Sequence, residues 1–348
     1  MKPTLSFQMR RIVPRPAAAA VVACCAALWL AALAQASGSP GPAQPAAAPP
    51  AAVTALAGPA GAAPDPRAAC RQGTVLTFVA HTDDDLLFMN PDQADAIRQG
   101  RCMRVVYLTA GDRGEGQPYL QARERGIMAA YASMAGVANR WHTDGWRVDG
   151  RTVVRHTLLA ASRVELVMLR IPDPWLGAGW GSLTPLSRLE SVPGTAVRAY
   201  APYPEDYSRD SLVAWLAALI ETVHPDDVRL MDASVEIPYD KLCWRCPGHD
   251  HPDHIASARL VEDAMRKAPG AYRRQAYLGY PSQERPANLD DSQKAVKTAV
   301  FLRYMANDPH YCRRRSHCSR PRGPEAAWVW RQYPVTPGLG APTLQARQ

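Results

Sequence analysis

Metal-binding side chains gather in two short stretches that lie far apart in the chain. The first contains His81, Asp83 and Asp84 at the end of an apolar run, and the second contains His251 and His254. Zinc takes about four ligands from His, Asp, Glu and Cys, and a hydrolytic site keeps one position for water. Together the two stretches offer more His and Asp than one zinc ion needs, which leaves a carboxylate for proton transfer. The pattern predicts a metal-dependent hydrolase.

The spacing within each stretch suits a shared ion. His81 and Asp84 are three residues apart at an expected strand-to-helix turn, so both can bind one ion from one loop. Asp83 lies between them, points elsewhere and can face the water. His251 and His254 are also three residues apart, where a loop meets a helix. Pro at position 252 suits the first helical turn, where its missing N–H matters little.

The elements that must position these residues follow from the alternation of apolar runs and amphipathic segments. Short β-favouring runs predict strands, and longer periodic segments predict helices. We expect strands at 74–80, 105–109, 165–171, 227–231 and 276–280, and helices at 119–135, 211–223, 255–267 and 290–305. This alternation is typical of an α/β fold with a mainly parallel sheet. Ligands bind such sheets at the carboxyl ends of their strands, where His81 to Asp85 are expected.

The stretch 172–208 is too long for an ordinary connection and is rich in Gly, Pro, Trp and Tyr. Its aromatic residues are Trp175, Trp180, Tyr200, Tyr203 and Tyr207. Aromatic rings stack on sugar faces, but they also fill irregular loops. Both interpretations remain open from the sequence.

At this point the two stretches resemble a known family. Residues 80–85 read A-H-T-D-D-D, which resembles the A-H-P-D-D-E signature of the PIG-L/LmbE-like N-acetylglucosaminyl deacetylases. Residues 251–254 read H-P-D-H, which matches the second motif of that family. The resemblance covers residues 72–308. It implies a Rossmann-like three-layer fold with a mainly parallel sheet, as in LmbE-like proteins.

The resemblance also implies roles for the residues. His81, Asp84 and His254 would be the zinc ligands, although another divalent metal is an alternative. Asp83 would be the general base on a zinc-activated water, and His251 would protonate the leaving amine or steady the oxyanion. The products would be acetate and an amino sugar.

Three further residues are weaker candidates for substrate binding. Either Arg123 or Arg125 would hold a substrate hydroxyl or phosphate, because the alignment of this segment with the family pattern does not decide between the two arginines. Asp112 either lines the cleft or belongs to an ordinary Gly-rich turn. Asp253 is a candidate for the substrate site or for orienting a neighbouring His.

The chain departs from the family pattern at two positions. Thr82 replaces the usual Pro, and Asp85 replaces Glu with a shorter side chain that we expect outside the ligand set. We expect both changes to affect catalytic efficiency more than membership of the family. A third stretch, H-P-D-D at 224–227, looks like the first motif. It follows a helix and precedes a strand, so we expect it at the wrong end of the sheet.

The first 36 residues have the pattern of a secretory signal. Four basic residues precede an apolar run from Ala17 to Leu33, and a small-x-small cleavage pattern ends at Ala36. An uncleaved membrane anchor is the alternative. We expect a signal peptide at 1–36, a disordered Ala/Pro-rich linker at 37–67, the deacetylase domain at 68–335 and a disordered tail at 336–348. The protein would then be secreted or periplasmic, with no membrane span after cleavage.

The charge of the mature chain is mild. The formal net charge of +8 falls to +4 on cleavage, because the signal carries four basic and no acidic residues. This balance does not favour a nucleic-acid partner. The sequence leaves the oligomeric state open.

Six cysteines remain after cleavage, and an even number in an exported protein favours disulfides. The spacing favours three local bridges, Cys70–Cys102, Cys243–Cys246 and Cys312–Cys318. The first pair precedes two strands whose starts lie close together if the strands are parallel neighbours. A second zinc site at the C-x-x-C of residues 243–246 is the alternative there, with His249 nearby.

These features predict an exported enzyme that removes the acetyl group from an N-acetylglucosamine-type sugar or glycoconjugate. Two alternatives use the same residues: a zinc amidase for another N-acylated substrate, and a sugar-binding homologue that has lost catalysis. The retention of Asp83 argues against the second alternative, because binding alone needs no base.

Overall fold

The structure is a computed structural model that describes residues 70–177, 179–244, 246–312 and 318–335. All of them belong to one unit, which spans Ala62–Gln348. The predicted signal peptide at 1–36, the linker at 37–67 and the tail at 336–348 lie outside the described residues.

An eight-stranded sheet forms the centre of this unit, with the strand order β10-β9-β8-β1-β2-β5-β4-β3. The five strands β9, β8, β1, β2 and β5 are parallel to one another. The strand β10 pairs antiparallel with β9 at one edge, and the β3–β4 hairpin pairs antiparallel with β5 at the other. The strands of the sheet are β1 (Thr74–Val79), β2 (Cys102–Thr109), β3 (Trp141–Val148), β4 (Arg151–Leu158), β5 (Val164–Ile171), β8 (Asp227–Met231), β9 (Arg273–Tyr277) and β10 (Pro334–Val335).

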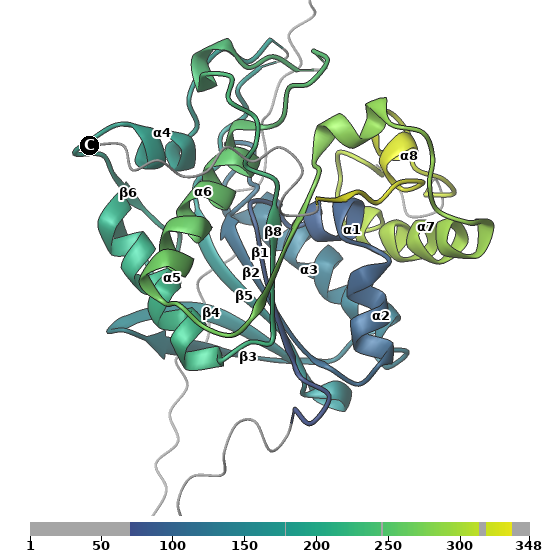
Figure 1. The fold of residues 1–348 in the computed structure, drawn as a ribbon. Coiled ribbons are helices and arrows are strands. Elements are labelled where there is room, and N and C mark those ends of the chain that lie inside the picture. The colour runs from purple at the N-terminus through teal and green to yellow at the C-terminus, as the bar shows by residue number, and fades with distance from the viewer. Residues whose placement is uncertain (1–69, 178, 245, 313–317, 336–348) are drawn as a thin grey trace, which may run out of the picture. The chain divides into compact units, whose positions relative to one another are not determined.

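Helices cover both faces of the sheet and complete three layers (Figure 1). The helices α5 and α6 lie on one face, and α2, α3 and α7 lie on the other. The helices are α1 (Asp84–Phe88), α2 (Asp92–Arg98), α3 (Gln117–Met134), α4 (Pro185–Ser191), α5 (Arg209–Val223), α6 (Pro252–Lys267), α7 (Asp291–Met305) and α8 (Glu325–Trp328). Short 3-10 turns occupy Leu159–Ala161, Tyr239–Lys241 and Tyr280–Glu284, and a separate small hairpin joins β6 (Ala196–Arg198) to β7 (Asp206–Ser208).

The predicted α/β class with a mainly parallel sheet is confirmed. All five predicted strands are the five parallel strands, although the last begins at Arg273 and ends at Tyr277 instead of spanning 276–280. The central strands β1, β5 and β8 are buried along their whole length, as expected for a sheet covered on both faces. The four predicted helices correspond to α3, α5, α6 and α7.

The structure contains elements that the apolar pattern did not indicate. The β3–β4 hairpin lies at an edge of the sheet, and every residue of β3 before Val148 is intermediate or exposed. Such a strand lacks the apolar run on which the other strands were recognised. The stretch 172–208 contains α4, β6 and β7, so it is not a single loop.

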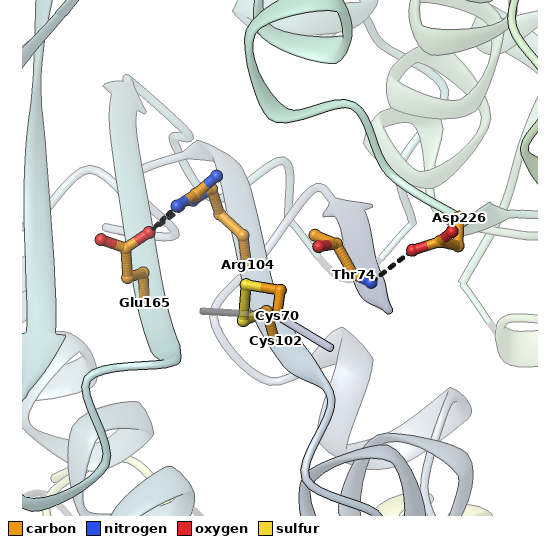
Figure 2. The surroundings of a disulfide bond; sticks show 6 residues. All are labelled: Cys70, Thr74, Cys102, Arg104, Glu165 and Asp226. Carbon is orange, nitrogen blue, oxygen red and sulfur yellow. Dashed lines mark hydrogen bonds and ion pairs between the residues drawn. A yellow bond between two sulfur atoms is a disulfide. The ribbon is translucent and has the colours of Figure 1, made fainter. Parts of the chain in front are cut away.

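The amino ends of the parallel strands lie opposite to their carboxyl ends, and Figure 2 shows the contacts around the starts of β1 and β2. The Cys70–Cys102 disulfide links the segment before β1 to the first residue of β2. The backbone N–H of Thr74 donates to Asp226 Oδ2 at 2.6 Å, so the 224–227 stretch lies at this end, as predicted. The three predicted disulfides are all present. In the described part of the chain, no helix combines the length and apolar character needed to cross a membrane.

Candidate metal centre and catalytic site

The polar motifs meet at the carboxyl ends of the parallel strands. The turn after β1 carries His81, Asp83 and Asp84, and the loop after β8 leads to the start of α6, with His251 and His254. Within the first turn, the backbone N–H of His81 donates to Asp84 Oδ2 at 2.7 Å. This bond holds the Asp84 carboxylate beside His81. Two stretches that are far apart in sequence therefore lie at one end of the sheet.

Three side-chain atoms converge there. His81 Nδ1 lies 3.2 Å from His254 Nε2 and 3.3 Å from Asp84 Oδ1. His254 Nε2 lies 2.9 Å from Asp84 Oδ1. All three side chains are buried. Two imidazoles and one carboxylate around one point form a donor set that suits a catalytic zinc ion with an open position.

The protonation of His254 supports this interpretation. Its Nδ1 lies 2.7 Å from Asp250 Oδ1, which also accepts the backbone N–H groups of His251 and Tyr280. A carboxylate oxygen is an acceptor, so His254 Nδ1 donates to Asp250, and Nε2 is the ring nitrogen that faces Asp84 and His81. Burial disfavours a charged His254, but Asp84 and Asp250 outweigh burial and raise its pKa to about 9. The point between the three side chains therefore attracts positive charge, and the residues fit a divalent cation.

Asp84 is held in its anionic form. Burial alone would favour the neutral acid, but His254 and His81 outweigh burial and hold the pKa of Asp84 well below its usual range. An anionic oxygen beside two imidazole nitrogens is the charge state that a metal ligand requires.

Asp83 lies beside this group, at the N-cap of α1, and lines a cavity. Arg123 Nη2 donates to its Oδ1 at 2.6 Å, and the Tyr311 hydroxyl donates to its Oδ2 at 3.2 Å. Burial raises the pKa of Asp83 above its ordinary value, against the opposing charge of Arg123. A carboxylate with a raised pKa accepts a proton more readily at neutral pH.

His251 is the N-cap of α6 and also lines the cavity. Its Nδ1 accepts the backbone N–H of Asp253 at 3.2 Å, so in the neutral ring the proton lies on Nε2. Its ring is 4.7 Å from that of His81, centroid to centroid. Burial, reinforced by the nearby His81 and His254, holds the pKa of His251 well below its usual value. His251 is therefore a neutral hydrogen-bond donor.

The three weaker candidates have different positions. Arg123 lines the cavity, and besides Asp83 it donates to the Gly111 carbonyl and the Tyr304 hydroxyl. Arg125 is exposed on α3, so Arg123 is the arginine that faces the site. A substrate contact for Arg123 stays a prediction.

Asp112 and Asp253 are fully buried. Asp112 accepts the Asp173 N–H at 2.7 Å and the Tyr200 hydroxyl at 3.0 Å, and so joins the loops beside the cavity. Asp253 Oδ1 accepts the Thr184 hydroxyl, and its Oδ2 lies 3.7 Å from His81 Nε2. The substrate contacts predicted for both residues stay untested, and the geometry favours positioning of neighbouring groups.

Sequence reasoning missed two carboxylates of the site. Asp250 orients His254, and it lies one residue before the recognised motif. Asp173 Oδ2 lies 3.4 Å from His81 Nε2, and burial raises the pKa of Asp173 to about 7 although His81 opposes this. Asp173 follows the strand predicted at 165–171, so the rule that ligands gather at strand ends would have indicated it.

Asp85, the residue that replaces the family's Glu, points away from the ligand atoms. It accepts the hydroxyls of Tyr107, at 3.0 Å, and of Tyr131. Burial raises the pKa of Asp85 to about 7, while both hydroxyl groups oppose the shift. Its contacts lie in the core behind the turn, as expected for a residue outside the ligand set.

The second candidate metal site holds a disulfide instead. Cys243 and Cys246 are bonded to each other, and His249 Nδ1 accepts the backbone N–H of Cys243 at 3.1 Å. Zinc binds the thiolate form of cysteine, which a disulfide does not provide. The predicted bridge is therefore present, in the loop that leads to His251.

The cavity has a volume of about 320 Å³ and two kinds of wall. One wall is aromatic: Trp180 and Tyr280 are stacked with ring centroids 5.9 Å apart, and Tyr280 and Trp328 are stacked at 4.5 Å. The rings of Trp180 and His251 form a T-shaped pair with centroids 5.0 Å apart. The other wall is polar and includes Arg113, Arg123, Asp173, His310 and Glu325.

Some aromatic residues of the stretch 172–208 border the cavity, as stacking on a substrate would require, and others fill the protein interior. Trp175 and Trp180 line the cavity, as a substrate cleft would require. Tyr207 is fully buried and fills the interior instead. The sequence pattern cannot separate these cases, because both use the same residue types.

Comparison with known proteins identifies the family of this chain. The profile of PIG-L, described as GlcNAc-PI de-N-acetylase, matches residues 76–265, which is more than half of the chain. No match is found among curated proteins.

Solved structures are similar at low identity. The conserved protein TT1542 from Thermus thermophilus is 17% identical, with a TM-score of 0.40 over 79% of this chain and 99% of that chain. GalB, the 4-carboxy-2-hydroxymuconate hydratase from Pseudomonas putida, is 17% identical, with a TM-score of 0.36 over 74% and 82%. The zinc-inhibited form of teicoplanin deacetylase Orf2 is 16% identical, with a TM-score of 0.34 over 68% and 84%. At such identities the likeness says nothing about the substrate. The match to the family profile is decisive: the chain belongs to the PIG-L family and is a metal-dependent hydrolase of the deacetylase type.

Proposed function

We propose that this protein is an exported zinc-dependent enzyme that removes the acetyl group from an N-acetylglucosamine-type sugar or glycoconjugate. The observation that carries the proposal is the convergence of the ligand group His81, Asp84 and His254 with Asp83 and His251. Asp83 and His251 both line the same cavity. Family membership supports the deacetylase chemistry.

His81, Asp84 and His254 would hold the cation, with Asp250 keeping His254 in the required tautomer. When bound, a divalent cation there supplies Lewis-acid chemistry, which polarises the amide carbonyl and lowers the pKa of water. Proton transfer and stabilisation of the oxyanion are carried out by side chains of the protein.

Asp83 accepts the proton of the attacking water, since its carboxylate borders the cavity and burial favours its protonated form. Arg123 and Tyr311 hold the two oxygens of this carboxylate and so fix its orientation. The departing nitrogen must leave as an amine, and protonated Asp83 returns the proton to it.

His251 steadies the oxyanion through its Nε2–H. Protonation of its Nδ1 would break the bond from the Asp253 N–H, so the geometry favours a neutral donor over an acid. Of the two roles that the sequence left open for His251, oxyanion stabilisation is the better supported.

Acetate release tests the proposal. Purified protein loaded with zinc is incubated with a panel of N-acetylated sugars, longer acyl analogues and acetylated peptides, and bound metal is quantified. Acetate from the N-acetylhexosamines supports the proposal. Faster release from longer acyl or peptide substrates indicates the zinc amidase instead. Binding of sugars without any hydrolysis indicates a sugar-binding homologue that has lost catalysis. A protein that binds no divalent metal contradicts both the deacetylase and the zinc amidase.

Export is the second part of the proposal. The disulfides Cys70–Cys102, Cys243–Cys246 and Cys312–Cys318 suit an oxidising compartment. Expression of the full chain in a host with a secretory pathway, followed by N-terminal sequencing, tests cleavage after Ala36 and the start of the mature chain. A cytoplasmic, unprocessed product would contradict export.

A further inference from the structure

The cavity that holds the candidate catalytic residues is small. Its volume of about 320 Å³ lies at the small end of the range of roughly 300–1,000 Å³ that is typical of small-molecule sites. Any longer substrate must therefore continue across the rim. The residues at the rim decide what can lie there.

Trp175 is an exposed aromatic side chain at this cavity. Among the described residues, five large apolar side chains are more than a third exposed, and Trp175 is the one that lines the cavity. It is 47% exposed. The guanidinium carbon of Arg113 lies over this ring, 4.3 Å from its centroid, so a cation with several hydrogen-bond donors covers one face of Trp175 and the opposite face is the one that a ligand can use.

The backbone around Trp175 is tied to the catalytic site. The backbone N–H of Asp173 donates to the Asp112 carboxylate, and the backbone of Pro174 pairs with that of Arg113 in an isolated parallel β-bridge. The Asp173 carboxylate in turn lies 3.4 Å from His81 Nε2. Trp175 is thus two residues from a side chain that contacts a metal-ligand candidate, in a segment held by the buried Asp112. Its position relative to the reacting centre is set by these contacts.

We propose that Trp175, with Arg113, is a stacking platform for a second sugar ring, so that the substrate is an oligosaccharide and not a single sugar. This inference rests on the proposed deacetylase function. A sugar ring presents C–H groups on its face and hydroxyls at its edge. Trp175 suits the face, and the donors of Arg113 suit the hydroxyls. The cavity also has the aromatic wall of Trp180 and Tyr280, but Trp175 itself is paired with the charged Arg113, whose donors suit sugar hydroxyls better than an acyl chain.

The test compares chain lengths. kcat/KM is measured for N-acetylglucosamine and for its β-1,4-linked dimer and tetramer, with wild-type protein and Trp175→Ala. The ratio of kcat/KM for tetramer over monomer should fall about fivefold to tenfold in the variant, the size expected for one lost ring contact. Trp175→Phe should keep most of the ratio, because it retains a ring, and it also controls for misfolding.

Trp330→Ala is the matched control. Trp330 is 49% exposed and does not line the cavity, so its loss should leave the ratio unchanged. An unchanged ratio in Trp175→Ala overturns the proposal. So does an equal loss on the octyl glycoside of N-acetylglucosamine, which would indicate a site for an apolar aglycone.

A binding measurement separates this proposal from the deacetylase function. If no acetate is released from any sugar, the deacetylase proposal fails, and calorimetric titration with the same monomer and tetramer still tests the platform. Wild-type protein should bind the tetramer more tightly than the monomer, and Trp175→Ala should lose that preference. Equal binding of both lengths by wild-type protein contradicts the platform.

Discussion

Asp250 Oδ1 lies 2.7 Å from His254 Nδ1 and thereby turns the other ring nitrogen toward Asp84 and His81. The carboxylate is buried, and it also accepts two backbone N–H groups. Partners of this kind orient metal ligands and raise their basicity. The proposed metal site therefore depends on a residue that is not itself a ligand.

Asp250→Asn should weaken zinc affinity about 10- to 100-fold, because a neutral amide holds the imidazole less firmly. Competition with a chromogenic chelator measures the affinity. Asp291→Asn is the control, since Asp291 is exposed at the start of α7. Unchanged affinity in the Asp250 variant would show that the tautomer is fixed by other means.

Removal of the metal should abolish activity and lower the free energy of unfolding. A ligand present at 100 times its dissociation constant stabilises the folded state by about 2.7 kcal/mol. Dialysis against a chelator followed by thermal denaturation measures the loss, and added zinc should restore both properties. In His254→Ala, the chelator should have little effect on the melting temperature, because the variant lacks one of the three ligands. A normal chelator response in that variant would argue against His254 as a ligand.

Arg123 should control the pH dependence of the reaction. The Arg123 charge lowers the pKa of Asp83, so its removal should raise that pKa further. Since Asp83 must be ionised to accept a proton, the acidic limb of the kcat/KM profile should move to higher pH in Arg123→Met. Circular dichroism identifies any folding defect. An acidic limb at the wild-type position would separate Arg123 from the base.

The buried His156 should make the fold sensitive to acid. Burial, assisted by Arg170, lowers the pKa of His156 to about 4, whereas an unfolded His titrates near 6.5. As the pH falls from about 6.5 to 4, the unfolded chain takes up a proton that the folded chain does not, so stability decreases. The loss is up to about 3 kcal/mol.

Urea denaturation at several pH values measures this loss. His156→Gln should flatten the dependence between pH 6.5 and 4. His142→Gln, an exposed histidine on the neighbouring strand β3, should leave it as in the wild type. The same slope in both variants would mean that other groups carry the acid sensitivity.

The Cys70–Cys102 disulfide should stabilise the fold without affecting the chemistry. It closes a loop with a sequence separation of 32 residues, for which chain entropy gives about 4 kcal/mol. The double variant Cys70→Ser, Cys102→Ser should lose roughly that stability and keep its zinc affinity, because the bridge lies at the amino ends of the strands. Zinc affinity that falls with stability would show that the two ends of the sheet are coupled.

Much of this architecture could be predicted from the sequence because its signals are local. An uncharged run such as 74–80 identifies a buried parallel strand, and the topology then gives the end at which His81 must lie. Contacts across the chain are harder. Asp173 lies 92 positions from His81 along the printed sequence and reaches it only in the folded protein. Asp250 lies only four residues before His254, but the sequence does not distinguish it from the other polar residues of its loop. The edge hairpin β3–β4 was missed because β3 is half exposed and carries no apolar run.

The separation of the two ends of the sheet has a consequence for variation in this protein. The covalent tie at Cys70–Cys102 and the ion pair between Arg104 and Glu165 secure the beginnings of the strands (Figure 2). The rim that bears Trp175 belongs to the opposite pole. Substitutions there can alter which substrates are accepted while the thermal tolerance of the scaffold is preserved, so selectivity and durability can evolve along independent routes.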